Sequence, residues 1–265
     1  MRSIKRSSCH RLHVVHILRN SPCAIIRQGE FFMNILVTGA SRGIGKAICE
    51  TLSINHKVFA TARNAALLKC YPNHLTADIS KKEDIERLGN YIIENKIDVL
   101  INNAGEYIYS PIDEISAAQL ESIISVNLKA PLYLISKAVP NMKKRRFGRI
   151  INIGSISGVL GEAGASLYSA TKSGLIGASK ALALELAEYN ITVNTINPGW
   201  VNTDMGNSSV TESEFTKDEI VECIPQKRFV EPVEVAGMIE YLISDKAKGV
   251  TGQSINLCAG LTCGF

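Results

Sequence analysis

The sequence predicts a single α/β domain built on a doubly wound, seven-stranded parallel sheet with helices on both faces. Short apolar runs alternate with helix-like amphipathic segments seven times. A glycine-rich turn directly follows the first apolar run and opens the first helical segment. Because helical crossovers bring the carboxyl ends of parallel strands to one edge of the sheet, ligands are expected to bind at that edge.

The expected strands are short runs rich in β-branched residues. They cover residues 34–38, 57–63, 75–80, 97–102, 148–153, 191–196 and 253–257. Helices are expected from Ile44 onward, over 81–95, twice within 113–143, from the Tyr168 region to about Tyr189, and over 232–243. Ser80 and Glu83 predict a capping box for the second helix. The segment 200–229 is polar and irregular with one short helix, which is typical of a lid or binding loop.

Residues 1–32 form a basic extension, with six Arg or Lys residues against one acid, Glu30. Because the whole chain carries only +4, the part from residue 33 onward is near neutral, which does not favour nucleic-acid binding. The extension fits a transit peptide, a disordered tail or a misplaced start codon. We favour the last, because Met33 directly precedes the first strand. The expected division is therefore a 1–32 extension without assigned function and a 33–265 folded domain.

Composition indicates an ordinary soluble protein, with 46% hydrophobic and 20% charged residues. No apolar run is long enough to span a bilayer, so no membrane partner is expected. The seven cysteines include no CxxC pair and have no histidine at metal-ligand spacing. We therefore expect reduced thiols, a cytoplasmic location and no metal site.

The glycine-rich turn runs from Gly39 to Gly45 between the first strand and the first helix. Glycines allow a tight turn and a close approach of a pyrophosphate, which the amides of a helix N-terminus can bind. No acid follows the second strand, where one would bind the ribose hydroxyls of NAD; Arg63 stands there instead. With Arg42 in the turn, this favours NADP(H), with NAD(H) also usable. Two solvated arginines are the alternative interpretation.

Tyr168 and Lys172 lie four residues apart in a helical segment, so their side chains share one face. A nearby lysine cation lowers the pKa of a phenol, which would suit Tyr168 to proton transfer. The alternative is a surface pair on an ordinary helix. Polar or glycine-containing turns also follow other strands, at residues 102–105, at Ser155 and at 198–199. Because these turns belong to the same sheet edge, they are expected to gather around Tyr168.

The motifs occur together in one order: TGASRGIG at 38–45, Asp78, NNAG at 102–105, Asn127, Ser155, YSATK at 168–172 and PG at 198–199. On these residues, nearly everything from Asn34 onward resembles the short-chain dehydrogenase/reductase family, whose domain is of the Rossmann type. The run SKALALELAEYNITVNTINPGWVNTDM is similar to the 3-oxoacyl-[acyl-carrier-protein] reductase type within that family.

The resemblance implies a role for each matching residue. Tyr168 would donate a proton to the substrate carbonyl oxygen, Lys172 would lower the pKa of Tyr168 and hold the nicotinamide ribose, and Ser155 would hydrogen-bond the carbonyl. Asn127 would hold a relay water behind Lys172. Asp78 would meet the adenine amino group, and Thr203 the carboxamide. The implied cofactor-binding set, besides Tyr168 and Lys172, is Gly39, Ser41, Arg42, Gly43, Ile44, Gly45, Arg63, Asp78, Asn103, Ala104, Gly105, Pro198, Gly199, Val201 and Thr203.

The expected function is NADPH-dependent reduction of a carbonyl to a secondary alcohol by a homotetramer. The substrate would be a small carbonyl compound or an acyl thioester, with acyl carrier protein as a candidate partner. Glu185 and Glu188 stand where such reductases tend to carry a cation for the acidic carrier, although Lys143 to Arg149 could substitute. A reductase of another ketone, sugar or alcohol is therefore one alternative. A non-catalytic dinucleotide-binding sensor is the second.

Overall fold

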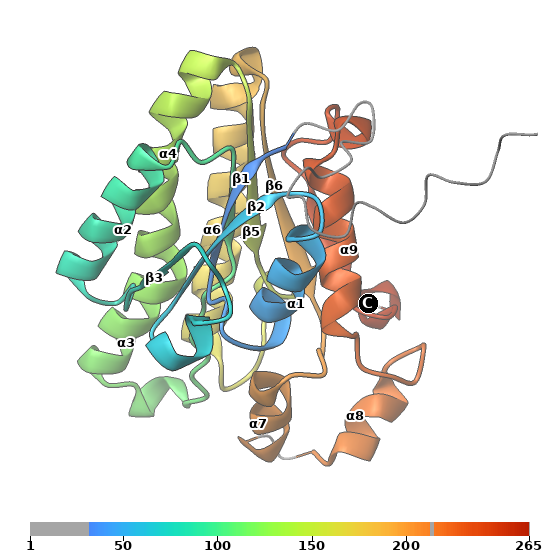
Figure 1. Ribbon diagram of the computed structural model, residues 1–265. Helices are drawn as coiled ribbons and strands as arrows, with labels where there is room; N and C mark the ends of the chain where they lie inside the picture. The colour runs from blue at the N-terminus through green and yellow to red at the C-terminus, as the bar shows by residue number, and fades with distance from the viewer. Residues whose placement is uncertain (1–31, 213–214, 265) are drawn as a thin grey trace, which may run out of the picture. The chain divides into compact units, whose positions relative to one another are not determined.

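Seven parallel strands form one sheet in the order β3-β2-β1-β4-β5-β6-β7 (Figure 1) in the computed structural model, which describes residues 32–212 and 215–264. The strands are β1 Asn34–Thr38, β2 Lys57–Ala62, β3 His74–Thr76, β4 Val99–Asn102, β5 Gly148–Ile153, β6 Ile191–Pro198 and β7 Ser254–Leu257. The direction of winding reverses between β1 and β4, which are paired from Ile35–Val99 to Val37–Ile101. A crevice at the carboxyl ends of such strands is the usual ligand site.

Helices cover both faces of the sheet, as expected for a doubly wound fold. On one face, α1 Gly43–Leu52 and α9 Pro232–Ile243 pack with Ile35 and Val37 of β1. On the other, α2 Lys82–Glu94, α4 Ala130–Arg145 and α6 Ser166–Leu186 enclose Leu36. Neighbouring residues of β1 enter opposite cores because side chains alternate along a strand. The predicted fold class is confirmed.

The region after the second strand differs from the prediction in two details. The third strand ends at Thr76 and not at residue 80. Ser80 does not cap α2: Lys81 is the N-cap and makes no side-chain capping bond. The Ser80 hydroxyl instead donates to Asp78 Oδ1 over 2.8 Å, and the Ser80 amide donates to the same oxygen. The local Asp78 turn therefore takes the hydroxyl that a capping box would use.

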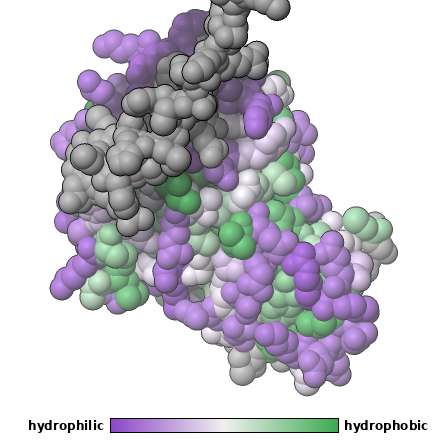
Figure 2. Space-filling view, turned by 45° about the vertical axis from the view of Figure 1, so that its right-hand side comes forward, coloured by the Kyte–Doolittle hydropathy of each residue, from purple (hydrophilic) through white to green (hydrophobic). Residues whose placement is uncertain are grey.

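The segment 200–229 is more helical than predicted. It holds two helices, α7 Asp204–Glu212 and α8 Lys217–Cys223, where one was expected. A capping box starts α8: the Thr216 hydroxyl accepts from the Glu219 amide, and the Glu219 carboxylate accepts from the Thr216 amide. The face of the molecule seen in Figure 2 is largely hydrophilic, with hydrophobic residues scattered among the hydrophilic ones.

Asn127 lies in a π-helical turn, whereas the sequence pattern predicted an ordinary α-helix at this position. Helix α3, Ala117–Ile124, is followed by a π-helical turn, Ser125–Lys129, before α4 begins at Ala130. Such turns displace the helical register and are frequent at functional sites. The remaining short helix is α5, Ser157–Leu160, and α6 continues as a 3₁₀ turn to Tyr189, where the predicted helix ended.

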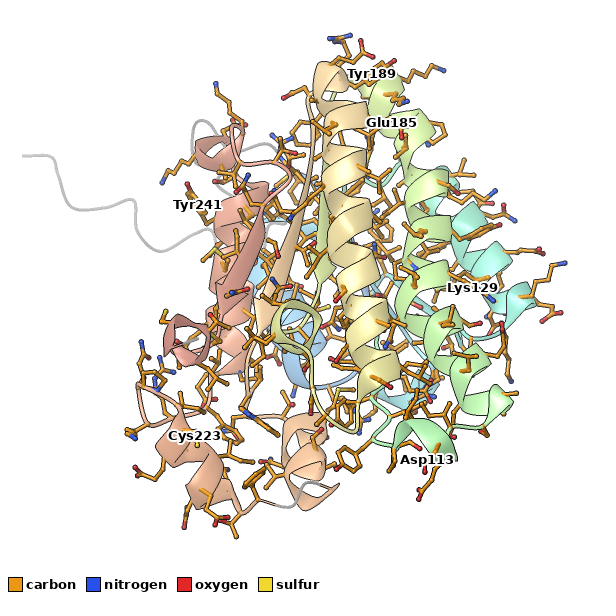
Figure 3. All side chains as sticks on the ribbon, turned by 180° about the vertical axis from the view of Figure 1, so that it is seen from behind. Asp113, Lys129, Glu185, Tyr189, Cys223 and Tyr241 are labelled. Carbon is orange, nitrogen blue, oxygen red and sulfur yellow. The ribbon has the colours of Figure 1, made fainter. Side chains whose placement is uncertain are left out.

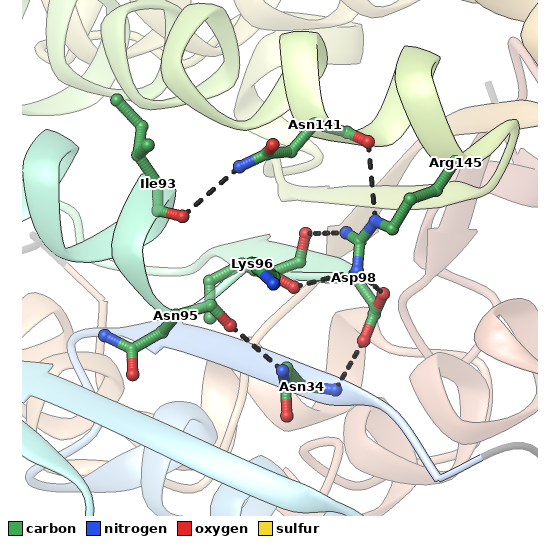
Figure 4. A network of polar contacts seen from close by, with 8 residues as sticks. Asn34, Ile93, Asn95, Lys96, Asp98, Asn141 and Arg145 are labelled. Atoms are coloured by element: carbon green, nitrogen blue, oxygen red, sulfur yellow. Dashed lines mark hydrogen bonds and ion pairs between the residues drawn. The ribbon is translucent and has the colours of Figure 1, made fainter.

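A polar network fastens the amino end of the sheet, at the edge opposite the carboxyl ends (Figure 4). Arg145 at the end of α4 forms an ion pair of 2.6 Å with Asp98, just before β4. The other Asp98 oxygen accepts from the Asn34 amide of β1 over 2.8 Å, and Arg145 also donates to the Lys96 carbonyl. One carboxylate thus joins two strands and a helix.

Within the described residues, no helix is both long enough and apolar enough to cross a membrane.

Candidate active site

A cavity of about 1630 Å³ opens at the carboxyl ends of the strands. The sequence-predicted cofactor residues all line it, and so do Ser155, Tyr168 and Lys172. They come from loops after β1, β2, β3, β4, β5 and β6 and from the first turns of α6. Asn127 is the exception among the predicted site residues, because it is fully buried behind the cavity wall.

The glycine turn suits a phosphate. Gly39 and Gly43 have φ of +69° and +53°, which favour glycine, and a Cβ on Gly45 would lie 2.2 Å from the Gly39 carbonyl oxygen. Helix α1 starts at Gly43 without a side-chain cap and without an acid in its first turn. Its first amides therefore face the cavity unneutralised, which fits the pyrophosphate of a dinucleotide.

Asn103 positions this turn from the next strand. Its side-chain amide donates to the carbonyls of Thr38 and Gly39 over 2.8 and 3.2 Å. The Thr38 hydroxyl accepts from the amides of Asn103 and Ala104, each over 3.0 Å. Asn103 lines the cavity, as predicted, but its amide is occupied in fixing the β1 and β4 loops against each other.

Two cations border the part of the cavity near β2. Arg42 lies 3.6 Å from Asp204 in an exposed ion pair, and Arg63 is exposed at the end of β2. Desolvation of Asp78 opposes its ionisation, but hydrogen bonds from Ser80 and the charge of Arg63 outweigh it and lower the pKa of Asp78. Arg63 therefore has an acid nearby, and both arginines remain accessible to an anionic ligand.

Tyr168 and Lys172 share one space, as the spacing predicted. Lys172 is 4% exposed, its Nζ donates to the Ile153 carbonyl over 2.8 Å, and it lies 5.5 Å from the centre of the Tyr168 ring. The predicted direction of the Tyr168 shift is wrong: burial raises its pKa to about 12, a hydrogen bond from Ser155 opposes this, and Glu162 adds to it. Burial also lowers the pKa of Lys172 to about 8.

Asn127 is held by its π-helical turn against the loop after β4. Its Oδ1 accepts from the Glu106 amide, and its Nδ2 donates to the Glu106 carbonyl, both over 2.8 Å. A second bond joins Nδ2 to the Thr171 hydroxyl at 3.3 Å. A Cβ on Gly105 would lie 3.5 Å from both Asn127 Oδ1 and Lys172 Nζ, so the glycine keeps the space between them open.

Three polar residues beside Ser155 were not predicted from the sequence. The Ser155 hydroxyl lies 3.1 Å from Ser157 Oγ, and Ser157 donates to Glu162 over 2.6 Å. The Tyr107 hydroxyl donates to the other Glu162 oxygen over 2.8 Å. The ring of Tyr107 meets that of Tyr168 edge-on, with centroids 5.0 Å apart. The sequence signal that could have indicated them is Glu162, an acid that lies between Gly161 and Gly164 just before Tyr168.

The segment 200–229 closes one side of the cavity, as expected of a binding loop. Trp200, Met205, Phe215 and Ile220 contribute apolar surface to the lining. Trp200 stacks on Phe229 with ring centroids 5.6 Å apart, which supports this wall from outside. In the described part of the chain, no cluster of three or more His, Cys, Asp or Glu side chains could hold a metal ion.

Comparison with known proteins agrees with this site. The short chain dehydrogenase family model matches residues 33–214, so the chain belongs to the short-chain dehydrogenase/reductase family and is an NAD(P)-dependent oxidoreductase. It is 35% identical over 240 residues to a 3-oxoacyl-[acyl-carrier-protein] reductase of Staphylococcus epidermidis, covering 85% of this chain and 97% of the relative.

Two solved structures have the same fold. An actinorhodin polyketide ketoreductase variant with NADPH matches with a TM-score of 0.82 and 35% identity, over 87% of this chain and 97% of the other. A protein described as an NAD(P) dependent gluconate 5-dehydrogenase from Beutenbergia cavernae, with bound NADP, matches with a TM-score of 0.81 and 27% identity, over 89% and 98%.

Proposed function

We propose that this protein is an NADPH-dependent reductase that converts a ketone to a secondary alcohol, with 3-oxoacyl thioesters as its substrate class. The observation that carries the proposal is the meeting of Ser155, Tyr168 and Lys172 at the wall of a cavity bordered by the glycine turn. The 3-oxoacyl reductase and the polyketide ketoreductase described above support the substrate class.

When bound in the cavity, NADPH would be the source of the hydride that the carbonyl carbon takes up. Ser155 and Tyr168 hold the carbonyl oxygen by hydrogen bonds and stabilise the negative charge that develops on it. Because the pKa of Tyr168 is raised to about 12, its phenol stays protonated at neutral pH and can give that proton to the oxygen. Lys172 would hold the nicotinamide ribose, and its charge would stabilise the phenolate left after proton transfer.

Asn127 is proposed to hold a water that returns a proton toward Lys172 and Tyr168. Support comes from the open space at Gly105, which separates Asn127 Oδ1 from Lys172 Nζ. Arg42 and Arg63 are proposed to bind the 2′-phosphate of NADPH, with Asp78 at the adenine and Thr203 at the carboxamide. NAD(H) would serve less well, because it lacks the phosphate that the two cations would pair with.

A cytoplasmic homotetramer and a carrier protein as donor of the acyl group complete the proposal. The five described cysteines are all free, which suits a reducing compartment. Glu185 and Tyr189 lie at the end of the molecule opposite Cys223, which lines the cavity (Figure 3). Within one protomer Glu185, at the end of α6, is therefore remote from Tyr168 in the first turn of that helix, and it would not repel a carrier at the same protomer's cavity. Light scattering on the purified protein tests the tetramer.

The first experiment measures NADPH oxidation with acetoacetyl-N-acetylcysteamine and with the same acyl group on acyl carrier protein. We expect turnover of both, and a loss of at least about a thousandfold in Tyr168→Phe with NADPH binding retained. No turnover of any neutral ketone or thioester, with NADPH still bound, would contradict the proposal and favour a dinucleotide sensor. Turnover of hydroxylated ketones alone would favour the sugar or polyol alternative.

A further inference from the structure

Glu162 lies beside the carbonyl site without belonging to the Ser155, Tyr168 and Lys172 set. It is half-buried in the turn between α5 and α6 and lines the cavity. Two hydrogen bonds connect it to Ser155 through Ser157, at 2.6 and 3.1 Å, so its Oε2 lies within about 6 Å of Ser155 Oγ. Because Ser155 is the group that would hold the substrate carbonyl, Glu162 stands close to the substituents of a bound ketone.

The position of this carboxylate is fixed by two hydroxyl groups. Ser157 donates to one oxygen and Tyr107 to the other, so both oxygens accept, as expected of an ionised carboxylate. The Tyr107 ring is itself packed edge-on against Tyr168. A carboxylate held this way cannot turn away from a bound ligand without breaking both bonds.

Within the described residues Glu162 forms no ion pair, because no Arg or Lys nitrogen lies within 4.0 Å of its carboxylate oxygens. The cations that line the cavity are Arg42 and Arg63, which border its cofactor part, and Lys172, whose Nζ is bonded to the Ile153 carbonyl. Glu106, on the loop after β4, is another carboxylate of the lining and accepts from Ser122 over 2.6 Å. The lining around the substrate carbonyl therefore includes the Glu162 carboxylate, which has no ion-pair partner among the described residues, as well as the Lys172 cation.

We propose that Glu162 is a specificity-determining residue, which positions Ser155 through Ser157 and excludes carbonyl compounds that carry a negative charge beside the reacting ketone. Neutral 3-oxo esters and thioesters would be accepted, whereas the corresponding 3-oxo acids would be rejected. This inference rests on the proposed reductase function.

The expected size of the preference for neutral esters over acids follows from like-charge repulsion between Glu162 and the substrate carboxylate. Two negative charges about 6 Å apart in a partly buried site repel strongly enough to reduce binding by roughly ten- to a hundredfold. A neutral ester or thioester has no such charge, and its oxygens can accept hydrogen bonds from Ser155 and Tyr168. Because this specificity is a difference in binding between the ester and the acid, it is measured as the ratio of their kcat/KM values.

The experiment compares kcat/KM for ethyl 3-oxobutanoate and 3-oxobutanoate, which share the ketone and differ in charge, with NADPH at pH 7. We expect wild type to favour the ester by at least about thirtyfold, and Glu162→Gln to narrow that ratio by about tenfold, mainly by improving the acid. Glu162→Asp keeps the charge and should keep most of the preference. Glu240→Gln, an exposed position on α9 outside the cavity lining, is the matched control for net charge and should change nothing.

An ester-to-acid ratio that is unchanged in Glu162→Gln, or that falls equally in Glu240→Gln, would overturn the assignment. A Ser157→Ala variant tests the positioning role: it should lower kcat for the ester while leaving the preference for the ester over the acid. If Glu162→Gln does not fold, added salt on wild type must raise the rate with the acid relative to the ester. Failure of the reductase proposal is distinct, because wild type would then turn over neither the ester nor the thioester.

Discussion

Lys172 is the buried cation of the active site, and its burial destabilises the fold at neutral pH. The folded protein holds its pKa at about 8, below the value of about 10.4 for an exposed lysine. Between these two values the unfolded chain binds more protons than the native state, so stability should rise with pH across that window. Below about pH 8 the full penalty applies.

We therefore expect Lys172→Met to abolish turnover but to unfold at a higher urea concentration than wild type at pH 7. The gain should be about 1–3 kcal/mol, less than the full shift implies because the Ile153 carbonyl loses its donor. Unfolding at pH 7 and at pH 10 measures it, and the difference between the two proteins should shrink at the higher pH. A difference that is the same at both values would contradict the buried-charge interpretation.

Arg63 tests the proposed cofactor preference at the same scale. Arg63→Ala should lower kcat/KM for NADPH by roughly tenfold and leave that for NADH within about twofold, because only NADPH carries the phosphate. Lys246→Ala removes an exposed cation that does not line the cavity and serves as control. An unchanged NADPH-to-NADH ratio in Arg63→Ala would show that Arg63 does not read the phosphate.

At the scale of elements, the loop between β1 and α1 is fixed by backbone contact. A Cβ on Gly45 would meet the Gly39 carbonyl oxygen at 2.2 Å and Asn103 Nδ2 at 2.5 Å, so the turn and its clamp from β4 must both shift. We expect Gly45→Ala to weaken NADPH binding by at least about tenfold and to destabilise the protein by about 1–3 kcal/mol. Titration by cofactor fluorescence and thermal unfolding measure the two effects.

Gly237 in α9 provides the matched control for that substitution. A Cβ there meets nothing within 4 Å, and its backbone is ordinary helix. Gly237→Ala should therefore raise stability by about 0.5–1 kcal/mol and leave cofactor affinity unchanged. Equal effects of the two substitutions on NADPH binding would refute the role of the close approach at Gly45.

At the scale of the whole molecule, the catalytic cavity and a stabilising polar network lie at opposite edges of the sheet. The cavity occupies the carboxyl edge of the sheet, and the Asp98 network occupies the amino edge (Figure 4). Because Asp98 joins Arg145 and the Asn34 amide, Asp98→Ala leaves two partly buried donors without their acceptor. We expect a loss of about 1–3 kcal/mol in the free energy of unfolding.

The same Asp98→Ala variant should keep kcat/KM within about twofold of wild type below its unfolding temperature, since no cavity residue contacts the network. Asp113→Ala, at an exposed position, should leave both quantities unchanged. A large loss of activity in folded Asp98→Ala would mean that the two edges of the sheet are coupled.

The sequence by itself determined the sheet, the glycine turn and the Tyr168–Lys172 pair, because each depends on local periodicity or on residues a few positions apart. The third strand was predicted over 75–80 but runs from His74 to Thr76, because the Asp78 turn, which takes the Ser80 hydroxyl, follows it. The second helix in 200–229 could have been found from its Thr216 and Glu219 capping box. These are local signals that the sequence contains.

Only the tertiary structure decided the chemistry of those residues. The pKa of Tyr168 rises because its surroundings exclude water, and that exclusion depends on loops from several strands, which no spacing along the chain reveals. The π-helical turn at Asn127 and the path from Ser155 to Glu162 and Tyr107 likewise join segments that meet only after folding. Sequence spacing identified which groups share a helix face, whereas burial and long-range contact set their charge and their partners.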